Sequence, residues 1–257
     1  MKSSPIFFVL LFIAAFSGRA EWVIHSARNE AGPAAGVVHR QVQVEDAIAG
    51  ESATLELAFF STKANLLRVI DNPSGTYDLA QAMPANQCLA GVNGGYFDPS
   101  FAPLGLRIID GKMVRPVVRA RLMTGILLSA RENMQILRVG EYSARRKAYS
   151  AVQCGPLLVD GGHAVKGLDR TRVARRTFAV VGTERAALGF CSEVSLGQLS
   201  QILSGVRLAE NFKISRALNL DGGSSSAFWF KRSNGTPFSI VEYKTVRDFV
   251  GIVPKKD

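Results

Sequence analysis

The chain has 257 residues, a formal net charge of +10 and a hydrophobic fraction of 47%. This composition excludes a disordered or fibrous protein, and the length suffices for one large domain or two small ones with a sizeable core. A basic chain of this kind favours anionic partners such as phosphate-bearing polymers, although we expect most of the charges to lie on a solvated surface.

Residues 1–20 have the pattern of a secretory signal peptide. Lys2 gives a short basic start, residues 6–16 form an apolar run, and Gly18-Arg19-Ala20 is a small-x-small cleavage pattern. The run is short for a membrane span, and an uncleaved anchor is the alternative. No later segment is apolar for long enough to span a membrane. We therefore expect an exported protein, periplasmic or secreted, with a mature domain at 21–257, and export disfavours nucleic acid as a partner.

Short strand-like segments dominate the mature chain. Apolar runs, alternating or continuous, predict strands at 37–44, 55–60, 66–70, 89–92, 106–109, 112–114, 124–128, 134–139, 153–159, 178–181, 186–190, 217–220, 227–230, 239–243 and 249–253. Residues 78–83 are a candidate short helix that ends before Pro84. Residues 140–152 are basic and form either a loop or another short helix.

The clearest helical pattern begins at Ser195. Ser195 and Gln198 have the spacing of a capping box. An apolar stripe at helical spacing follows, formed by Leu196, Leu199, Ile202, Leu203 and Val206. Because short turns join most of the expected strands, antiparallel or mixed pairing is favoured. The sequence predicts an α+β fold with mixed or antiparallel sheets and few helices, in a single domain.

The mature chain contains three cysteines, Cys88, Cys154 and Cys191. Export permits a disulfide, and three cysteines allow three single bridges with one thiol left over. Of these we favour Cys154–Cys191. No Cys-x-x-Cys or Cys/His pattern indicates zinc.

The most informative stretch is 217–226. Its predicted strand is followed at once by Asp221, Gly222, Gly223 and three serines. The two glycines allow a positive φ and let a ligand approach backbone amides, while the carboxylate and hydroxyls form a dense polar cluster. A β-hairpin explains the Asp-Gly pair alone. It requires neither Asn219, nor the second glycine, nor the serines, so we interpret this turn as functional.

A second stretch has the same pattern. Asn93-Gly94-Gly95 follows an apolar strand and precedes Tyr96, Phe97 and Asp98. We expect these two glycine-rich loops to converge on one site; two unrelated tight turns are the alternative. Arg175 and Arg176 are candidate anion binders, since a guanidinium matches phosphate in a two-pronged contact, and only one of them needs to face the site.

These motifs, in this order, resemble those of the phosphodiester glycosidase family. The matching residues are Asn93-Gly94-Gly95-Tyr96-Phe97, Gly105 with Asp110-Gly111, Gly155-Pro156-Leu157, Arg176-Thr177-Phe178-Ala179-Val180, the helix at 195–204, Asn219-Leu220-Asp221-Gly222-Gly223-Ser224-Ser225 and the segment 247–253. The order and spacing hold from about residue 57 to residue 254. The chain departs from the family pattern at Ser224, where a third glycine is common, and at Phe178, where alanine is usual.

The resemblance implies an exported hydrolase that cleaves the C1–O–P bond of glycosyl-1-phosphodiesters and releases a sugar and a phosphate monoester. In that reaction Asp221 is the candidate base or nucleophile. Asp98 is the second carboxylate, because glycosidases generally use two. Asn93 and Asn219 would orient the sugar hydroxyls or the carboxylates, and Arg176 would hold the phosphate.

Further donors complete the predicted substrate site. Backbone amides at Gly94-Gly95 and Gly222-Gly223 would form anion-binding concavities, with Ser224 and Ser225 as added donors and Tyr96 beside them. No cofactor is expected. The oxygens of Asp98 and Asp221 suit Ca²⁺, but no calcium-loop spacing is present and no metal is claimed.

Two other functions remain open. The chain is alternatively an exported, non-catalytic module that binds phosphorylated or anionic glycans, because a basic surface and glycine-rich loops fit that role equally. A hydrolase that uses Cys88 or a serine is a third hypothesis. It lacks a G-x-S-x-G elbow, and the matched motifs contain no histidine.

Overall fold

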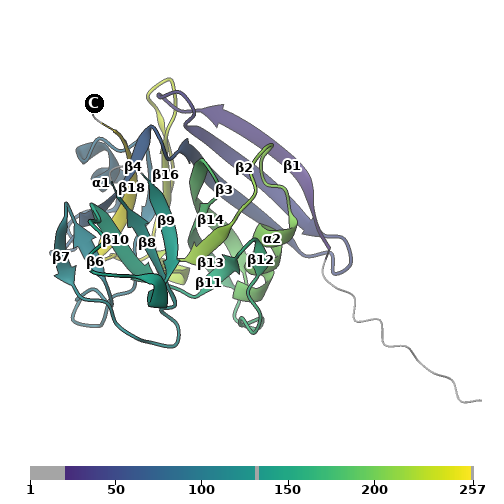
Figure 1. The fold of residues 1–257 in the computed structure, drawn as a ribbon. Coiled ribbons are helices and arrows are strands. Elements are labelled where there is room, and N and C mark those ends of the chain that lie inside the picture. The colour runs from purple at the N-terminus through teal and green to yellow at the C-terminus, as the bar shows by residue number, and fades with distance from the viewer. Residues whose placement is uncertain (1–20, 131–132, 256–257) are drawn as a thin grey trace, which may run out of the picture.

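The computed structural model describes residues 21–130 and 133–255, so the predicted signal peptide lies outside the described residues. Three sheets form the fold (Figure 1). The largest has eight strands in the order β1-β2-β3-β14-β13-β15-β11-β12. Their bounds are β1 (Trp22–Ala31), β2 (Val38–Asp46), β3 (Ser52–Ser61), β11 (Leu157–Asp160), β12 (His163–Ala164), β13 (Ala174–Val181), β14 (Arg185–Val194) and β15 (Arg216–Asn219).

Two five-stranded sheets pair in the orders β7-β6-β10-β8-β9 and β17-β16-β5-β18-β4. The strands of the first are β6 (Arg107–Ile109), β7 (Lys112–Arg115), β8 (Gly125–Ser129), β9 (Met134–Arg138) and β10 (Ser150–Cys154). Those of the second are β4 (Asn65–Asp71), β5 (Ala90–Asn93), β16 (Phe228–Lys231), β17 (Pro237–Ile240) and β18 (Asp248–Pro254).

Every strand pair of these three sheets in the described residues is antiparallel. The helical elements are α1 (Leu79–Ala85), α2 (Leu196–Gly205) and the two 3₁₀ turns η1 (Val139–Glu141) and η2 (Gly223–Ser225). The predicted antiparallel sheets and scarcity of helices are confirmed, but the fold is mostly β rather than α+β.

The eight-stranded sheet separates two hydrophobic cores. On one face, Phe60 and Leu188 pack with side chains of the two five-stranded sheets, such as Val92 and Leu127. On the other face, Leu57 belongs to a core that includes the apolar stripe of α2. Residues alternate between the two faces along β3 and β14, as a sheet buried on both sides requires. The glycine-rich loops therefore leave strands that are fixed by buried packing.

The helix α2 matches its sequence prediction. Ser195 caps it, since the Ser195 hydroxyl accepts from Gln198 N and the Gln198 side chain accepts from Ser195 N. Helix α1 differs from its prediction, because Pro84 lies inside the helix rather than beyond its end. The last turn is closed by Asn86, whose N–H reaches the Ala82 and Met83 carbonyls. Neither α-helix of the described residues is long and apolar enough to cross a bilayer.

Strand β1 has no counterpart among the predicted strands. Most of its residues are exposed, so it lacks the apolar alternation that marks a half-buried strand. It pairs along its length with β2, and Figure 1 shows the two as the long purple hairpin at the edge of the molecule. The segment 140–152, predicted as a loop or a short helix, contains no α-helix. It includes the end of the short turn η1 and the first residues of strand β10.

The Cys154–Cys191 disulfide prediction is wrong. All three cysteines are free thiols and all are buried. Cys154 belongs to the core between the sheets, whereas Cys191 belongs to the core beneath α2 on the opposite face of the eight-stranded sheet. The sheet itself therefore separates the two sulfur atoms.

Candidate active site

The two glycine-rich stretches meet, as the sequence predicts. Asn93 ends β5 and Asn219 ends β15, and the loops that follow them are hydrogen-bonded to each other. The Asp221 N–H donates to the Gly94 carbonyl at 3.1 Å, and Asn93 Nδ2 donates to the Asp221 carbonyl at 2.7 Å. The alternative of two unrelated turns is excluded by these contacts.

Asn93 acts within this junction as an internal brace. Its side chain is fully buried, and its Oδ1 accepts from Thr177 Oγ1 at 2.7 Å and from Ala227 N at 3.0 Å. Together with the bond to Asp221, these contacts use both ends of the amide. Asn93 therefore positions the Asp221 loop, and the predicted alternative of contact with sugar hydroxyls is not supported.

Asn219 and Tyr96 form a second polar group that converges on the Gly155 carbonyl. Asn219 Nδ2 donates to this carbonyl at 3.0 Å and to Tyr96 Oη at 3.2 Å, while Tyr96 Oη donates to the same carbonyl at 2.6 Å. Burial raises the pKa of Tyr96, so the phenol is protonated at neutral pH. Asn219 Oδ1 is buried and has no hydrogen-bond partner among the described residues.

Asp221 is half-buried and faces this polar group across its loop. The Gly222 N–H donates to its Oδ1 at 3.0 Å. Burial raises the pKa of the Asp221 carboxyl; the Ser225 hydroxyl, Lys244 and the Gly222 amide oppose this rise, and nearby Asp248 adds to it. Asp221 is thus a stronger base than an ordinary aspartate, which is a property of carboxylates that accept protons in catalysis.

The Arg176 side chain lies next to the Asp221 loop and is fixed there by two hydrogen bonds. Its Nε donates to the Val194 carbonyl at 2.9 Å and its Nη2 to the Arg172 carbonyl at 2.5 Å. These bonds fix the guanidinium so that Nη1 lies 3.9 Å from where a Cβ on Gly222 would stand. Burial lowers the pKa of Arg176, but a guanidinium remains charged at neutral pH.

Arg175 has a structural role instead. Its Nη2 donates to the carbonyls of Ser226 and Val241, the latter at 2.7 Å, and its Cζ lies 4.1 Å from the centre of the Tyr243 ring. The two loops that flank the Asp221 turn are thereby held together. Of the two predicted anion binders, Arg176 stays the candidate, because no hydrogen bond among the described residues uses its Nη1.

The prediction that the Gly94 and Gly95 amides bind an anion is wrong, because Asp248 already occupies them. Gly94 N donates to the Asp248 carbonyl at 2.8 Å and Gly95 N to its Oδ1 at 2.9 Å. A Cβ on Gly94 would lie 1.8 Å from Asp248 Oδ1, and one on Gly95 would lie 2.1 Å from Arg107 Nη2. Both glycines are required by close packing rather than by a ligand.

Arg107 and Asp248 were missed by the sequence analysis. Both are buried, and Arg107 Nε donates to Asp248 Oδ2 at 2.7 Å. Further bonds run from the guanidinium to the carbonyls of Leu106, Gln153 and Tyr96. The available signal was a charged residue at each of two apolar strand segments, because a charge buried in a sheet needs a partner.

The Gly222-Gly223 turn, in contrast, is open at Gly223, although a Cβ on Gly222 would stand 3.2 Å from the Arg175 carbonyl. Gly223 has a φ of +66°, and no heavy atom lies within 4 Å of the Cβ position. Ser224 is exposed. Ser225 is buried, and its hydroxyl lies beside the Asp221 carboxylate and lowers the pKa of that carboxyl. Gly223 and Ser224 therefore form the accessible part of this turn.

Asp98, the predicted second carboxylate, is not brought into this group. Its Oδ1 accepts from Ser100 N and Oγ and from Ala102 N, at 2.9, 2.6 and 2.9 Å. These bonds lower the pKa of Asp98, as expected for a carboxylate that holds its own turn. No hydrogen bond in the described residues joins it to the Asp221 loop.

Lys244 lies near Asp221 and is a site residue that the sequence did not predict. Its backbone N–H donates to the Ser224 carbonyl at 3.3 Å. The charge of its side chain lowers the pKa of Asp221, and its Nζ lies 5.0 Å from the centre of the Phe97 ring. It comes from the loop between β17 and β18. A lysine in a polar loop gives no signal in sequence, because only the fold places it beside Asp221.

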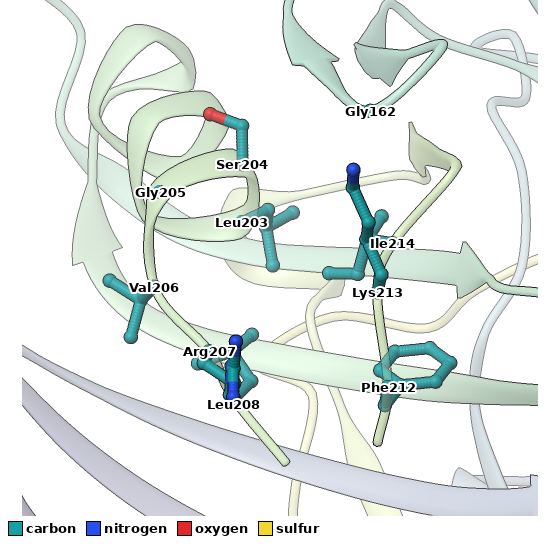
Figure 2. A pocket seen from close by; sticks show the side chains of 10 residues that line it. All are labelled: Gly162, Leu203, Ser204, Gly205, Val206, Arg207, Leu208, Phe212, Lys213 and Ile214. Atoms are coloured by element: carbon teal, nitrogen blue, oxygen red, sulfur yellow. The ribbon is translucent and has the colours of Figure 1, made fainter. Parts of the chain in front are cut away.

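A pocket and the distribution of metal-binding side chains were also compared with the Asp221 site. A pocket of about 290 Å³ lies between the end of α2 and the segment 206–214, and Figure 2 shows Leu203, Phe212 and Ile214 in it with the Lys213 side chain extending towards Gly162. None of the predicted site residues lines it. No group of three or more His, Cys, Asp or Glu side chains that could hold a metal comes together in the described residues.

Comparison with known proteins gives a match to one family model and similarity to solved structures, two of which are described here. The sequence model of the family described as phosphodiester glycosidase matches residues 86–253, which is more than half of the chain. The catalytic domain of zebrafish N-acetylglucosamine-1-phosphodiester alpha-N-acetylglucosaminidase, auto-inhibited by its pro-peptide, has a similar fold, with a TM-score of 0.62 and 16% identity over 89% of this chain and 88% of that one.

A hypothetical protein from Synechocystis has a TM-score of 0.59 and 17% identity over 84% of this chain and 62% of that one. No curated protein sequence matches the chain. At these identities the structural likeness extends to the fold alone, so the family match and the site geometry carry the functional argument.

Proposed function

The chain belongs to the phosphodiester glycosidase family and is a glycosidase-type hydrolase, and we propose that it cleaves the C1–O–P bond of glycosyl-1-phosphodiesters. The observation that supports this substrate is the group around the open turn. Asp221 is a carboxylate with a raised pKa and has the charge of Lys244 nearby, and the Arg176 guanidinium approaches the adjacent Gly222. Cations are needed to hold a phosphodiester, and a basic carboxylate is needed to activate a nucleophile.

The proposed reaction needs one carboxylate. The leaving group is a phosphate monoester, which departs readily and requires little protonation. Asp221 accepts a proton from a water molecule as the water oxygen bonds to C1, while the C1–O bond breaks and its electron pair leaves with the phosphate. Arg176 Nη1 and Lys244 would hold the phosphate, and Asn219 Oδ1 and Ser225 would bond the sugar. This assignment explains why Asp98 can serve its own turn instead.

A cysteine nucleophile is disfavoured. Burial raises the pKa of Cys88, Cys154 and Cys191 to about 12. At neutral pH these groups are therefore thiols, and the thiolate is the reactive form.

We also propose that residues 1–20 direct export and are removed. Mass spectrometry of the secreted or periplasmic protein should then show that it begins at Glu21.

The test uses the 21–257 protein and a panel of α-glycosyl-1-phosphodiesters, with free sugar and phosphate monoester measured together. Asp221→Asn should lower turnover by about 10²–10⁴-fold, the usual effect of losing a positioned acid–base group. Asp98→Asn is the matched control and should leave turnover within a few-fold of wild type.

Near-normal turnover of the Asp221→Asn enzyme would remove this assignment. If no diester yields product but sugar phosphates raise the melting temperature of the wild type, the chain is a binding module and the proposed reaction is wrong.

A further inference from the structure

The segment 113–122, which we call the 113–122 loop, exposes an unusual set of side chains. It begins in the edge strand β7 and runs towards β8, and every residue in it is exposed. Five of its residues are large and apolar, namely Met113, Val114, Val117, Val118 and Leu122. Leu122 is 61% exposed. Contiguous apolar surface of this kind marks an interaction site on a soluble protein.

Three arginines lie among these apolar side chains. Arg115, Arg119 and Arg121 form no ion pair with any described acidic residue. The loop itself contains no acid. It therefore combines an apolar surface with positive charge that no ion pair neutralises, although Arg115 lies near enough to lower the pKa of Asp98.

The loop is held in place by the protein core. Gln153 is fully buried, and its Oε1 accepts from Val118 N at 3.0 Å while its Nε2 donates to the carbonyls of Val118 at 2.6 Å and Met123 at 3.1 Å. A buried amide that makes two bonds to the loop and one to the residue just after it fixes the path of the loop. The apolar side chains are therefore displayed outward by a supported backbone.

Strand β10, which carries Gln153, connects this loop to the active site. Gln153 belongs to β10, and two residues later the Gly155 carbonyl accepts the bonds from Tyr96 and Asn219. A groove of about 600 Å³ is lined by Arg119 and Arg121 of the loop together with Leu157, which begins β11 two residues after Gly155. The side chain that supports the loop and the carbonyl bonded by Tyr96 and Asn219 thus lie two residues apart in the chain.

We propose that the 113–122 loop binds an anionic lipid surface. Aliphatic side chains enter the boundary between headgroups and acyl chains, and arginine stems lie along them while the guanidinium groups reach lipid phosphates. All the charges of the loop have one sign, which complements an extended anionic surface. Resting on the proposed function, this surface would bring Asp221 to glycosyl phosphodiesters whose phosphate is carried by a lipid.

The test measures sedimentation of the 21–257 protein with phosphatidylcholine vesicles, with and without phosphatidylglycerol. Wild type should bind the anionic vesicles and release in high salt. Arg119→Gln with Arg121→Gln should bind roughly 30-fold more weakly, since each arginine near such a surface contributes about 1 kcal/mol. The matched control, Arg28→Gln with Arg207→Gln, removes the same charge from exposed positions elsewhere and should bind like wild type.

The apolar contribution has its own control pair. Leu122→Ser should weaken vesicle binding several-fold, whereas Ile48→Ser should not, although both side chains are 61% exposed. None of these positions belongs to the Asp221 site, so hydrolysis of a short-chain, soluble diester should be unchanged in all variants. That readout separates failure of this proposal from failure of the proposed reaction.

Equal sedimentation with neutral and anionic vesicles would overturn the proposal, as would equal binding by the loop variants and their controls. A wild-type dimer in light scattering that Leu122→Ser converts to a monomer would also overturn it, because the loop would then be an interface between two copies of the chain.

Discussion

The two glycine-rich turns of this protein have nearly the same sequence pattern and opposite structural roles. At Asn93-Gly94-Gly95 the backbone amides are bonded to Asp248, and an added Cβ would collide with Asp248 or Arg107. At Asp221-Gly222-Gly223 the turn is open, and no atom lies within 4 Å of the Gly223 Cβ position. The first turn supports the packing of the site, whereas the second presents the Asp221 carboxylate to a ligand.

The difference teaches that an Asn/Asp-Gly-Gly pattern after a strand identifies a site without assigning its parts. A buried ion pair, Arg107–Asp248, occupies the amides of the first turn and so fixes it beneath the second. The second turn is held by its backbone, through Asn93, the Gly94 carbonyl and the bonds from Tyr243 and Lys244 to the Ser224 carbonyl. Substitutions in one turn therefore test whether the first turn supports the packing and the second faces a ligand.

Breaking the support of the first turn should have the largest effect on stability. Arg107→Met leaves Asp248 buried without its partner, which typically lowers the free energy of unfolding by about 3–5 kcal/mol. Arg68→Met is the matched control, because it breaks a partly exposed pair with Asp110 and should cost no more than about 1 kcal/mol. Urea denaturation measures both variants, and equal losses would contradict the role given to Arg107.

Adding one methyl group to each turn should separate them next. Gly94→Ala forces a Cβ to within 1.8 Å of Asp248 Oδ1 and should destabilise the protein by about 1–3 kcal/mol through overpacking. Gly223→Ala meets no atom, and only its positive φ opposes it, at about 1 kcal/mol. Thermal unfolding of the two variants gives the comparison. A Gly223→Ala protein less stable than Gly94→Ala would show that the second turn is the packed one.

The smallest effect concerns the pH dependence of stability at Asp221. Its pKa is raised in the folded state, so the stability linked to this group is complete below the unfolded value of about 3.9 and is lost as pH rises through the folded value. Asp221→Asn removes this loss. The variant should therefore melt above wild type at neutral pH, and the difference should shrink as the pH falls towards 4.

A matched Asp98→Asn protein should behave in the opposite way. The pKa of Asp98 is lowered by its turn, so this variant should melt below wild type at neutral pH. Melting curves between pH 4 and pH 7 measure both, and an Asp221→Asn protein that is less stable than wild type at neutral pH would contradict the raised pKa.

Some elements of this fold were predictable because their signals are local. The capping box at Ser195, the apolar stripe of α2 and the alternating strands come from interactions a few residues apart. Strand β1 was not predictable, because its exposed side chains carry no apolar period and only its pairing with β2 makes it a strand. The cysteine pairing failed for a related reason, since the sheet that separates Cys154 from Cys191 is a tertiary feature.

The site divides in the same way. The sequence by itself determined that Asn93, Asp221 and the two glycine pairs belong to one polar centre, because strand ends rich in glycine and short polar residues rarely occur without a reason. Only the tertiary structure decided which of them face a ligand. Asp98 bonds its own turn, Asp248 occupies the Gly94-Gly95 amides, and Lys244 arrives beside Asp221 from a distant loop. Hydrogen-bond partners far apart in sequence set these roles, and a pattern of neighbouring residues contains no information about them.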